Sequence, residues 1–184
     1  MTTEGDSPTN DPVWAEVVAD AGAITEEYRD RDWDVVVLEP ADISPVEDGD
    51  RTGFDVVVSD AEYDLVETLV EGDDGSFTDA DVYYRPSDGS DRRFALVLER
   101  DEASETAVCI PLTYSISSAR SVLEGALLDE ELLVHVRTLR SDTDDDDHED
   151  RSKQWVTFSH DDPSLFLEES DVRDWDESET EDDT

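Results

Sequence analysis

The sequence predicts an α+β fold, with one domain built on a mostly antiparallel sheet and three or four helices. Apolar residues recur at helical spacing in separate segments, and β-branched runs of strand length lie between those segments. Three of these runs follow one another through short, turn-rich connections, which is typical of an antiparallel meander. At 184 residues, one domain is the expected number, and the chain is long enough to bury a core.

The first helix is expected to begin at Pro12, after a disordered N-terminus of residues 1–10. Asp11 is a suitable N-cap, and proline is favoured at the first helical position. The apolar residues that follow share one helical face and indicate about five turns. They are Val13, Trp14, Val17, Val18, Ala21, Ile24 and Tyr28.

Two strands are expected after this helix. WDVVVLEP (33–40) and FDVVVSD (54–60) are β-branched runs of strand length. The segment 41–52 contains Pro45 and Gly49, which are turn and loop residues. We therefore expect a loop over 41–52.

The middle of the chain is expected to hold a helix followed by three antiparallel strands. Ser59 and Glu62 have the spacing of a capping box, ahead of an amphipathic helix that ends near Gly72. Three strands bounded by turn-rich segments follow: 81–86, 93–100 and 106–114. Pro111 predicts that the last of these strands lies at a sheet edge or carries a bulge.

A further helix and a hairpin complete the expected core. Apolar residues at helical spacing mark the helix between Ile116 and Leu127. ELLVHVRTLR (131–140) and QWVTFSH (154–160) alternate like the two strands of a hairpin, joined by an acidic loop over 141–152. Two C-terminal segments are expected beyond them: a short helix at 162–169 and a disordered acidic tail at 170–184.

The outward side of the 131–140 strand leaves two alternatives open. Val134 and Val136 are expected to face the core, so Leu133, His135 and Leu139 lie on the opposite side. If the first helix covers that side, the leucines are core residues. If it is open, they form a docking strip with His135 for a partner or a second copy. We expect Leu133 to be buried and His135 to be exposed.

Acidic residues dominate the composition, with 54 Asp and Glu against 13 Lys and Arg and a net charge of −41. The loop 142–150 carries −7 and the segment 168–184 carries −9, which leaves −25 on the other 158 residues. A uniformly acidic surface repels itself in dilute buffer, whereas at about 1 M salt the Debye length falls to about 3 Å. The regular apolar pattern argues against a disordered acidic chain. The composition, with a single lysine, resembles cytoplasmic proteins of extremely halophilic archaea.

We expect a cytoplasmic protein that binds neither nucleic acid nor membrane. Cys109 is the only cysteine, which fits a reducing compartment and excludes an internal disulfide. The acidic N-terminus is unlike a signal peptide, and no apolar run approaches the roughly 18 residues of a membrane span. A phosphate backbone would meet a surface of like charge.

Four segments resemble those of a small haloarchaeal domain family without assigned function: WDVVVLEP, FDVVVSDAEYD, AVCIPLTY and WVTFSHDDPSLF. The resemblance spans about residues 11–169 and implies an archaeal cytoplasmic protein, with no catalytic residues to carry over. The order of elements from residue 60 is also similar to the secretion-chaperone-like fold. That resemblance implies a non-enzymatic scaffold that dimerises and holds partner proteins.

A basic and aromatic cluster is the candidate ligand-binding site. It comprises Arg85, Arg92, Arg93 and Tyr83, with Tyr84 beside them and His135 as a further candidate. A small anionic ligand or an acidic partner segment could dock at these cations. The alternative is that the arginines pair with the abundant carboxylates across neighbouring strands.

The remaining motifs predict local structure and no metal site. The loop from Asp142 has carboxylates at calcium-ligand positions, but Asp147 and Lys153 occupy the places where a calcium loop needs glycine and glutamate. Ser59 and Asp60 follow a strand, as hydrolase nucleophiles and phosphoacceptors do. They lack the glycines or the acidic pair that such sites need, so we interpret them as helix-capping residues.

The sequence leaves the specific function unknown. We expect a non-enzymatic binding or protein-interaction module that uses no cofactor and acts through a protein partner or self-association. One alternative is a small enzyme that uses strand-end carboxylates such as Glu39 and Asp60. Another is an acidic protein that mimics DNA, although a mimic would gather its charge on one face.

Overall fold

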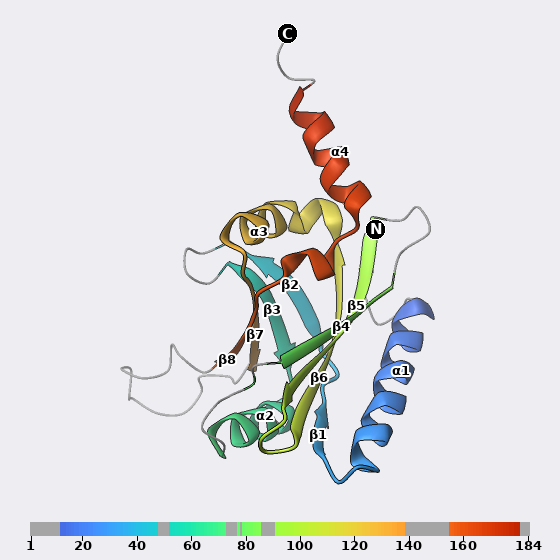
Figure 1. Ribbon diagram of the computed structural model, residues 1–184, viewed down its shortest axis with the longest axis vertical. Helices are drawn as coiled ribbons and strands as arrows, with labels where there is room; N and C mark the ends of the chain where they lie inside the picture. The colour runs from blue at the N-terminus through green and yellow to red at the C-terminus, as the bar shows by residue number, and fades with distance from the viewer. Residues whose placement is uncertain are drawn as a thin grey trace, which may run out of the picture.

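The strands divide between two sheets instead of forming one. The computed structural model describes residues 12–47, 52–72, 77, 79–85, 91–138 and 155–180, and shows a single α+β domain (Figure 1). Its helices are α1 Pro12–Arg29, α2 Asp60–Gly72, α3 Ile116–Asp129 and α4 Glu169–Thr180, with a 3-10 turn η4 at Pro163–Phe166. The expected N-terminus 1–10, the acidic loop 141–152 and Leu139 lie outside the described residues.

Sheet A contains the expected meander. Its strand order is β1 (Asp34–Val37), β6 (Thr106–Ser115), β5 (Arg92–Asp101) and β4 (Asp79–Arg85). The β4–β5 and β5–β6 pairs are antiparallel, as predicted, and β1 adds in parallel to β6. The β1 pairing ends at Val37 and Cys109, so Pro111 lies on a stretch of β6 that β1 no longer covers. Proline is tolerated there because its missing N–H breaks no ladder bond.

Sheet B has the order β2 (Asp42–Val46), β3 (Gly53–Val58), β7 (Leu132–Thr138) and β8 (Trp155–His160). The β7–β8 hairpin is antiparallel, as predicted, whereas β3 and β7 run parallel. The expectation of a loop over all of 41–52 was wrong, because residues 42–46 form β2. Pro45 is compatible with a strand here because β2 is the edge strand of its sheet.

The main core lies between the two sheets, and α2 and α3 close it. Val97 and Ile110 of sheet A and Val56 and Val134 of sheet B belong to this core, and all four are fully buried. Side chains alternate along a strand, so the other face of sheet A needs its own cover. That cover is α1, which forms a second core there with Trp14, Val17, Ala21, Phe94, Leu96 and Leu98.

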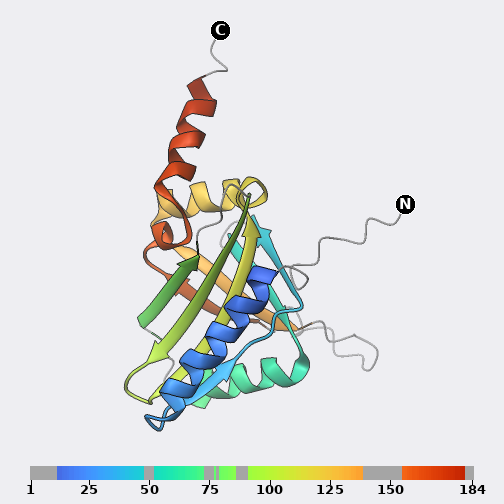
Figure 2. The same cartoon turned by 90° about the vertical axis from the view of Figure 1, so that its right-hand side faces the viewer.

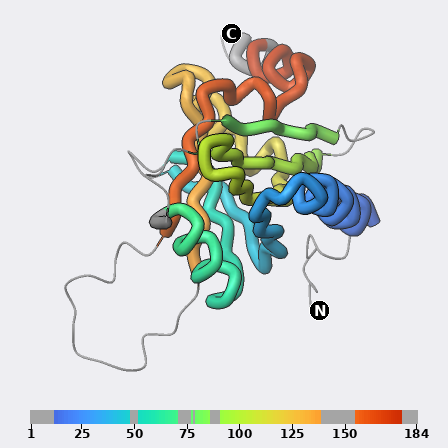
Figure 3. Tube along the Cα trace, turned by 60° about the horizontal axis from the view of Figure 1, so that its bottom comes forward, coloured from blue at the N-terminus to red at the C-terminus, as the bar shows by residue number. Residues whose placement is uncertain are grey.

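Helix α1 therefore packs on sheet A and does not cover the outward side of β7. Figures 2 and 3 show α1 lying along the strands of sheet A, apart from β7 and β8. The alternative in which the first helix covers Leu133 is wrong, since Trp14 belongs to the second core with strands of sheet A and Val18 packs against that core. Within the described ranges, no helix combines the length and the apolar character needed to cross a bilayer.

The C-terminal region differs from the sequence expectation. In place of a helix over 162–169 there is the short turn η4, with Asp162 capping it through its contact with Ser164. In place of a solvated tail from residue 170 there is α4, which projects from the body beyond α3 (Figures 1 and 2). Asp171 and Trp175 of α4 are buried.

Candidate functional site

A groove lies between α1 and β4, on the face of sheet A that α1 only partly covers. A helix is about 10 Å wide and strands are about 4.8 Å apart, so one helix cannot cover four strands. The groove encloses about 290 Å³. Its lining comes from three elements: Val17, Asp20, Ala23 and Ile24 of α1, Tyr83, Tyr84 and Arg85 of β4, and Leu96 of β5. We call this feature the α1–β4 groove.

Two of the sequence-predicted site residues, Tyr83 and Arg85, line this groove. Tyr83 is 48% exposed, one of the few large apolar side chains open to solvent in the described chain. Its pKa is raised by partial burial and, to a smaller extent, by the nearby carboxylate of Asp81. The phenol therefore stays neutral and offers a ring face and a hydroxyl to a ligand.

Arg85 closes one end of the groove by tying β4 to α1. Its guanidinium donates to Glu16 at 2.9 Å and to Asp20 at 2.5 Å. Both carboxylates are largely exposed, so these pairs are screened by salt and contribute little to stability. One cation between two anions leaves this end of the groove net negative.

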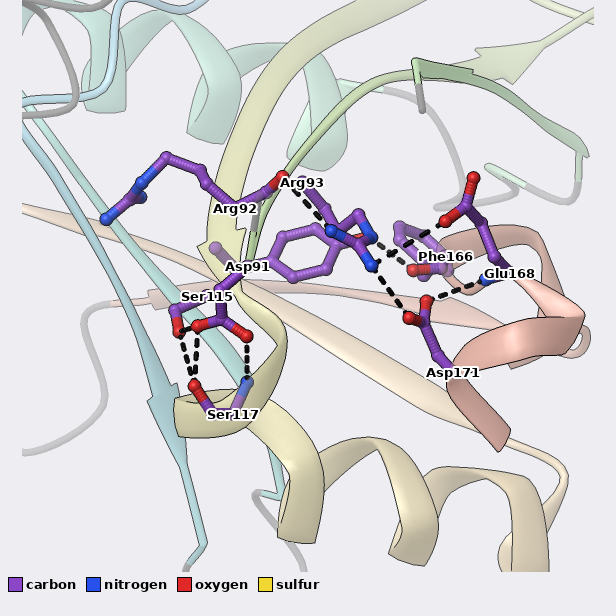
Figure 4. A network of polar contacts seen from close by, with 9 residues as sticks. Asp91, Arg92, Arg93, Ser115, Ser117, Phe166, Glu168 and Asp171 are labelled. Carbon is purple, nitrogen blue, oxygen red and sulfur yellow. Dashed lines mark hydrogen bonds and ion pairs between the residues drawn. The ribbon is translucent and has the colours of Figure 1, made fainter. Parts of the chain in front are cut away.

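Arg93 lies apart from the groove, on the face of β5 that carries Ala95 and Val97 of the main core, opposite the face that packs on α1. Figure 4 shows its polar contacts. It is 7% exposed and donates to Asp171 of α4 at 2.7 Å, with Glu168 at 3.6 Å. Arg92 donates to the hydroxyl of Thr113 at 3.2 Å. The predicted cluster is thus divided between two faces of one sheet, because Arg92 and Arg93 are successive residues of β5.

The Arg93 network holds the C-terminal segment against the body. Tyr114 of β6 donates its hydroxyl to the backbone carbonyl of Phe166, and burial raises the pKa of this tyrosine well above its usual value. Burial likewise raises the pKa of Tyr84 to about 12, partly offset by the nearby Arg93. Both phenols remain neutral beside the Arg93–Asp171 pair.

Asp91, just before β5, fixes the start of α3 in the same region (Figure 4). It accepts hydrogen bonds from the hydroxyls of Ser115 and Ser117 and from the backbone N–H of Ser117. These bonds favour the carboxylate and lower the pKa of Asp91. Ser115 is also the N-cap of α3.

His135 is not an exposed binding residue, contrary to the expectation from alternation. It does lie on the outward side of β7, but it is only 1% exposed. Its Nδ1 pairs with the hydroxyl of Thr157 at 2.8 Å, and its ring meets Trp155 edge to face. Leu133 is half-buried, and Leu139 lies outside the described residues. A strip that includes an exposed His135 does not form, because this histidine is buried.

The structure reveals a buried polar pair that the sequence did not single out. Oε1 of Glu99 in β5 contacts Nε2 of His160 in β8. Glu99 is 1% exposed and His160 is 4% exposed. His160 Nδ1 donates to the carbonyl of Leu132 at 3.1 Å. Burial alone lowers the pKa of His160, but the bond to Glu99 and its charge outweigh this effect and raise it. Both ring nitrogens are occupied, so neither is available to move a proton for a substrate.

The other candidate residues have local structural roles. Ser59 and Glu62 form the predicted capping box. The backbone N–H of Ser59 donates to the carboxylate of Glu62 at 3.4 Å, and the backbone N–H of Glu62 donates to the hydroxyl oxygen of Ser59 at 3.3 Å. Asp60 accepts from the hydroxyl of Thr138, and the backbone N–H of Glu39 donates to Glu62 at 2.6 Å. Cys109 is fully buried, and burial raises its pKa to about 12. Among the described residues, no cluster of three or more His, Cys, Asp and Glu side chains could hold a metal ion.

Comparison with known proteins yields one match. A family model covers residues 2–168, and its description is that of a family of unknown function. No curated protein and no solved structure matches the chain.

Proposed function

Because the chain belongs to DUF7529, a family of unknown function whose model matches residues 2–168, we propose its function from its own geometry: it is a non-enzymatic protein-interaction module. The α1–β4 groove is its docking site. The occupant is a partner segment that presents an apolar side chain next to an arginine or lysine.

The floor of the groove supports an apolar anchor. Val17, Ile24 and Leu96 contribute aliphatic surface, and the exposed ring of Tyr83 forms one wall. A volume of about 290 Å³ suits one or two side chains. A few buried anchors, most often aromatic side chains and arginine, carry most of the binding energy in protein interfaces.

The acidic side chains around the groove favour a partner segment that carries a cation next to its apolar anchor. Glu16 and Asp20 stand on the α1 side, where Arg85 neutralises only one of their two charges. Asp81 stands on the β4 side, paired with Arg100 at 3.2 Å, and Glu102 is 4.0 Å from the same arginine. An anionic ligand would have to displace these carboxylates, whereas a cation adds to them. A cation near Tyr83 also gains from the face of its ring.

We place this module in the cytoplasm of a halophilic archaeon. The excess of 54 acidic over 13 basic residues supports this setting. In multimolar salt the Debye length is about 3 Å or less, so only charges in direct contact attract one another. Recognition there must combine apolar burial with contact ion pairs, which is the combination that the groove offers.

A peptide titration in multimolar KCl tests the proposal. The probes are a short acetylated peptide containing Phe-Arg and a matched peptide containing Phe-Glu, followed through the NMR methyl signals of Val17, Ile24 and Leu96. We expect the Phe-Arg peptide to shift these signals and to bind at least tenfold more tightly than the Phe-Glu peptide.

Two exposed apolar residues provide the variant and its control. Tyr83→Ser should abolish the methyl shifts, whereas Leu128→Ser, at an 86% exposed site on α3, should leave them unchanged. Equal binding of both peptides, or equal binding by the Tyr83→Ser protein, would count against the groove as the docking site.

A further inference from the structure

Over residues 169–176, helix α4 contacts the body through one narrow face, and the helix lies outside the segment that the family model matches. The match ends at residue 168, and α4 begins at Glu169. Asp171 and Trp175, one helical turn apart, are buried, and Val172 is half-buried between them. Glu169, Ser170, Arg173, Asp174 and Asp176 are exposed.

The first of the two buried side chains is a carboxylate held by Arg93. Oδ1 of Asp171 accepts from Nη2 of Arg93 at 2.7 Å, and Oδ2 accepts from the backbone N–H of Glu168 at 3.1 Å. Asp171 is 6% exposed and Arg93 is 7% exposed. A buried cation of this kind requires an anionic partner, since removing one member of a buried pair typically costs about 3–5 kcal/mol.

The second buried side chain is an indole held by Arg120 of α3. Trp175 is 8% exposed and belongs to the main core. The guanidinium of Arg120 lies 5.7 Å from the ring centroid, and its Nη2 donates to the carbonyl of Trp175 at 3.4 Å. Arg120 is itself oriented by Glu124, which accepts from its Nε at 2.8 Å.

We propose that Arg93 and Arg120 form a receptor for an acidic helix that presents an aspartate and a tryptophan one turn apart, and that α4 occupies this receptor as an intramolecular competitor for such a helix on a partner protein. The receptor residues lie within the family segment, whereas the occupant follows it. The contact is separate from the α1–β4 groove, because Arg93 faces the opposite side of sheet A. The two sites can therefore be tested independently.

The geometry allows α4 to leave without dismantling the sheets. Between η4 and α4 the chain passes through Leu167 in an extended conformation, with φ −135° and ψ 158°. Phe166, which is fully buried, and its bond from Tyr114 anchor the chain before this point. Release of α4 would expose Arg93 and the site of Trp175 and leave the anchor at Phe166 in place.

The test uses the full chain and a labelled synthetic peptide of residues 167–180. In the protein, Asp171→Asn with Trp175→Ala weakens the internal contact and empties the receptor. In multimolar KCl, we expect this variant to bind the peptide at least tenfold more tightly than the unaltered chain does, by fluorescence anisotropy. Asp174→Asn, on the exposed face of α4, is the matched control and should behave like the unaltered chain. A peptide carrying the same two substitutions should not bind.

Equal affinity of the emptied variant and the unaltered chain for the peptide would overturn the proposal, as would equal binding of the substituted peptide. If the emptied variant is destabilised, its thermal unfolding in multimolar KCl is measured with and without excess peptide. Binding to the folded state must then raise Tm. No rise in Tm would overturn the proposal equally.

Discussion

At the scale of single residues, the Glu99–His160 pair shows how this protein uses a buried charge. Both nitrogens of His160 face acceptors, the carboxylate of Glu99 and the carbonyl of Leu132. An imidazole can satisfy two acceptors only when both nitrogens carry hydrogen. The charged form is therefore favoured, and the pair joins β5 of sheet A to β8 of sheet B.

The raised pKa of His160 predicts a loss of stability at alkaline pH. A group whose pKa is higher in the folded state than its ordinary value of 6.5 stabilises the fold fully below that value, and the stabilisation is lost as pH rises through the folded pKa. A tenfold difference in proton affinity between the folded and unfolded states corresponds to about 1.4 kcal/mol. We expect the free energy of unfolding, measured by denaturant titration in high salt, to fall as the pH rises above about 6.5.

The Glu99→Gln variant distinguishes the pH dependence that His160 causes from any pH dependence that the other histidines cause. The neutral amide cannot stabilise an imidazolium by charge, so this variant should be less stable near pH 6 and should show a flatter pH dependence. An unchanged slope in the Glu99→Gln protein would assign the alkaline loss to another group.

At the scale of elements, the parallel β3–β7 pair depends on one glycine. A Cβ added to Gly53 would lie 2.0 Å from the backbone oxygen of Leu133, and backbone cannot move aside as a flexible side chain can. Gly53→Ala must therefore push β3 away from β7. We expect a loss of more than about 2 kcal/mol in the free energy of unfolding, with a lower denaturation midpoint.

Two helical glycines serve as controls for this substitution. Gly22 in α1 and Gly125 in α3 have nothing within 4 Å of an added Cβ. Alanine is favoured over glycine inside helices by about 0.5–1 kcal/mol, so Gly22→Ala and Gly125→Ala should stabilise the protein. A Gly53→Ala protein as stable as these two would contradict the close approach of β3 and β7.

Helix α2 was predictable from the local sequence, whereas helix α4 was not. Helix α2 has a capping box and a strong apolar stripe, so its start and end follow from local sequence. Over residues 169–176, the part of helix α4 whose burial the structure describes, the apolar residues on the inward face are Val172 and Trp175, and the other buried residue is the charged Asp171. Its docking depends on Arg93, 78 residues earlier in the chain. Local patterns cannot indicate a partner so distant in sequence.

At the scale of the whole molecule, arginines connect elements across an acidic surface. Arg85 joins β4 to α1, Arg93 joins β5 to α4, and Arg137 joins β7 to β3 through Asp55 at 2.7 Å. Arginine suits this role because its planar guanidinium makes several directed hydrogen bonds and remains charged. The net charge of −41 already counts these arginines, so it remains after the pairs have formed.

The remaining charge predicts that folding requires salt. Far-UV circular dichroism should show cooperative thermal unfolding in multimolar KCl and loss of structure in dilute buffer, because screening removes the repulsion among carboxylates. A non-ionic osmolyte at a matched concentration strengthens apolar burial without screening and should restore less structure. A Tm that stays constant between about 0.1 M and 3 M KCl would contradict the halophilic interpretation.

The sequence by itself determined the α+β class, the meander, the β7–β8 hairpin and the starts of α1 and α2. These features depend on periodicity, capping and turn residues within a few positions of one another. It also identified Tyr83 and Arg85, which do line a groove. Only the tertiary structure decided that the strands form two sheets and that α1 covers sheet A. It also decided that Arg93 pairs with Asp171 of α4 and that His160 pairs with Glu99. Those pairings join residues 61 or more positions apart. These pairings depend on which faces of the sheets and helices pack together. The sequence cannot predict them, because a chain with 54 carboxylates has many acidic residues near every arginine.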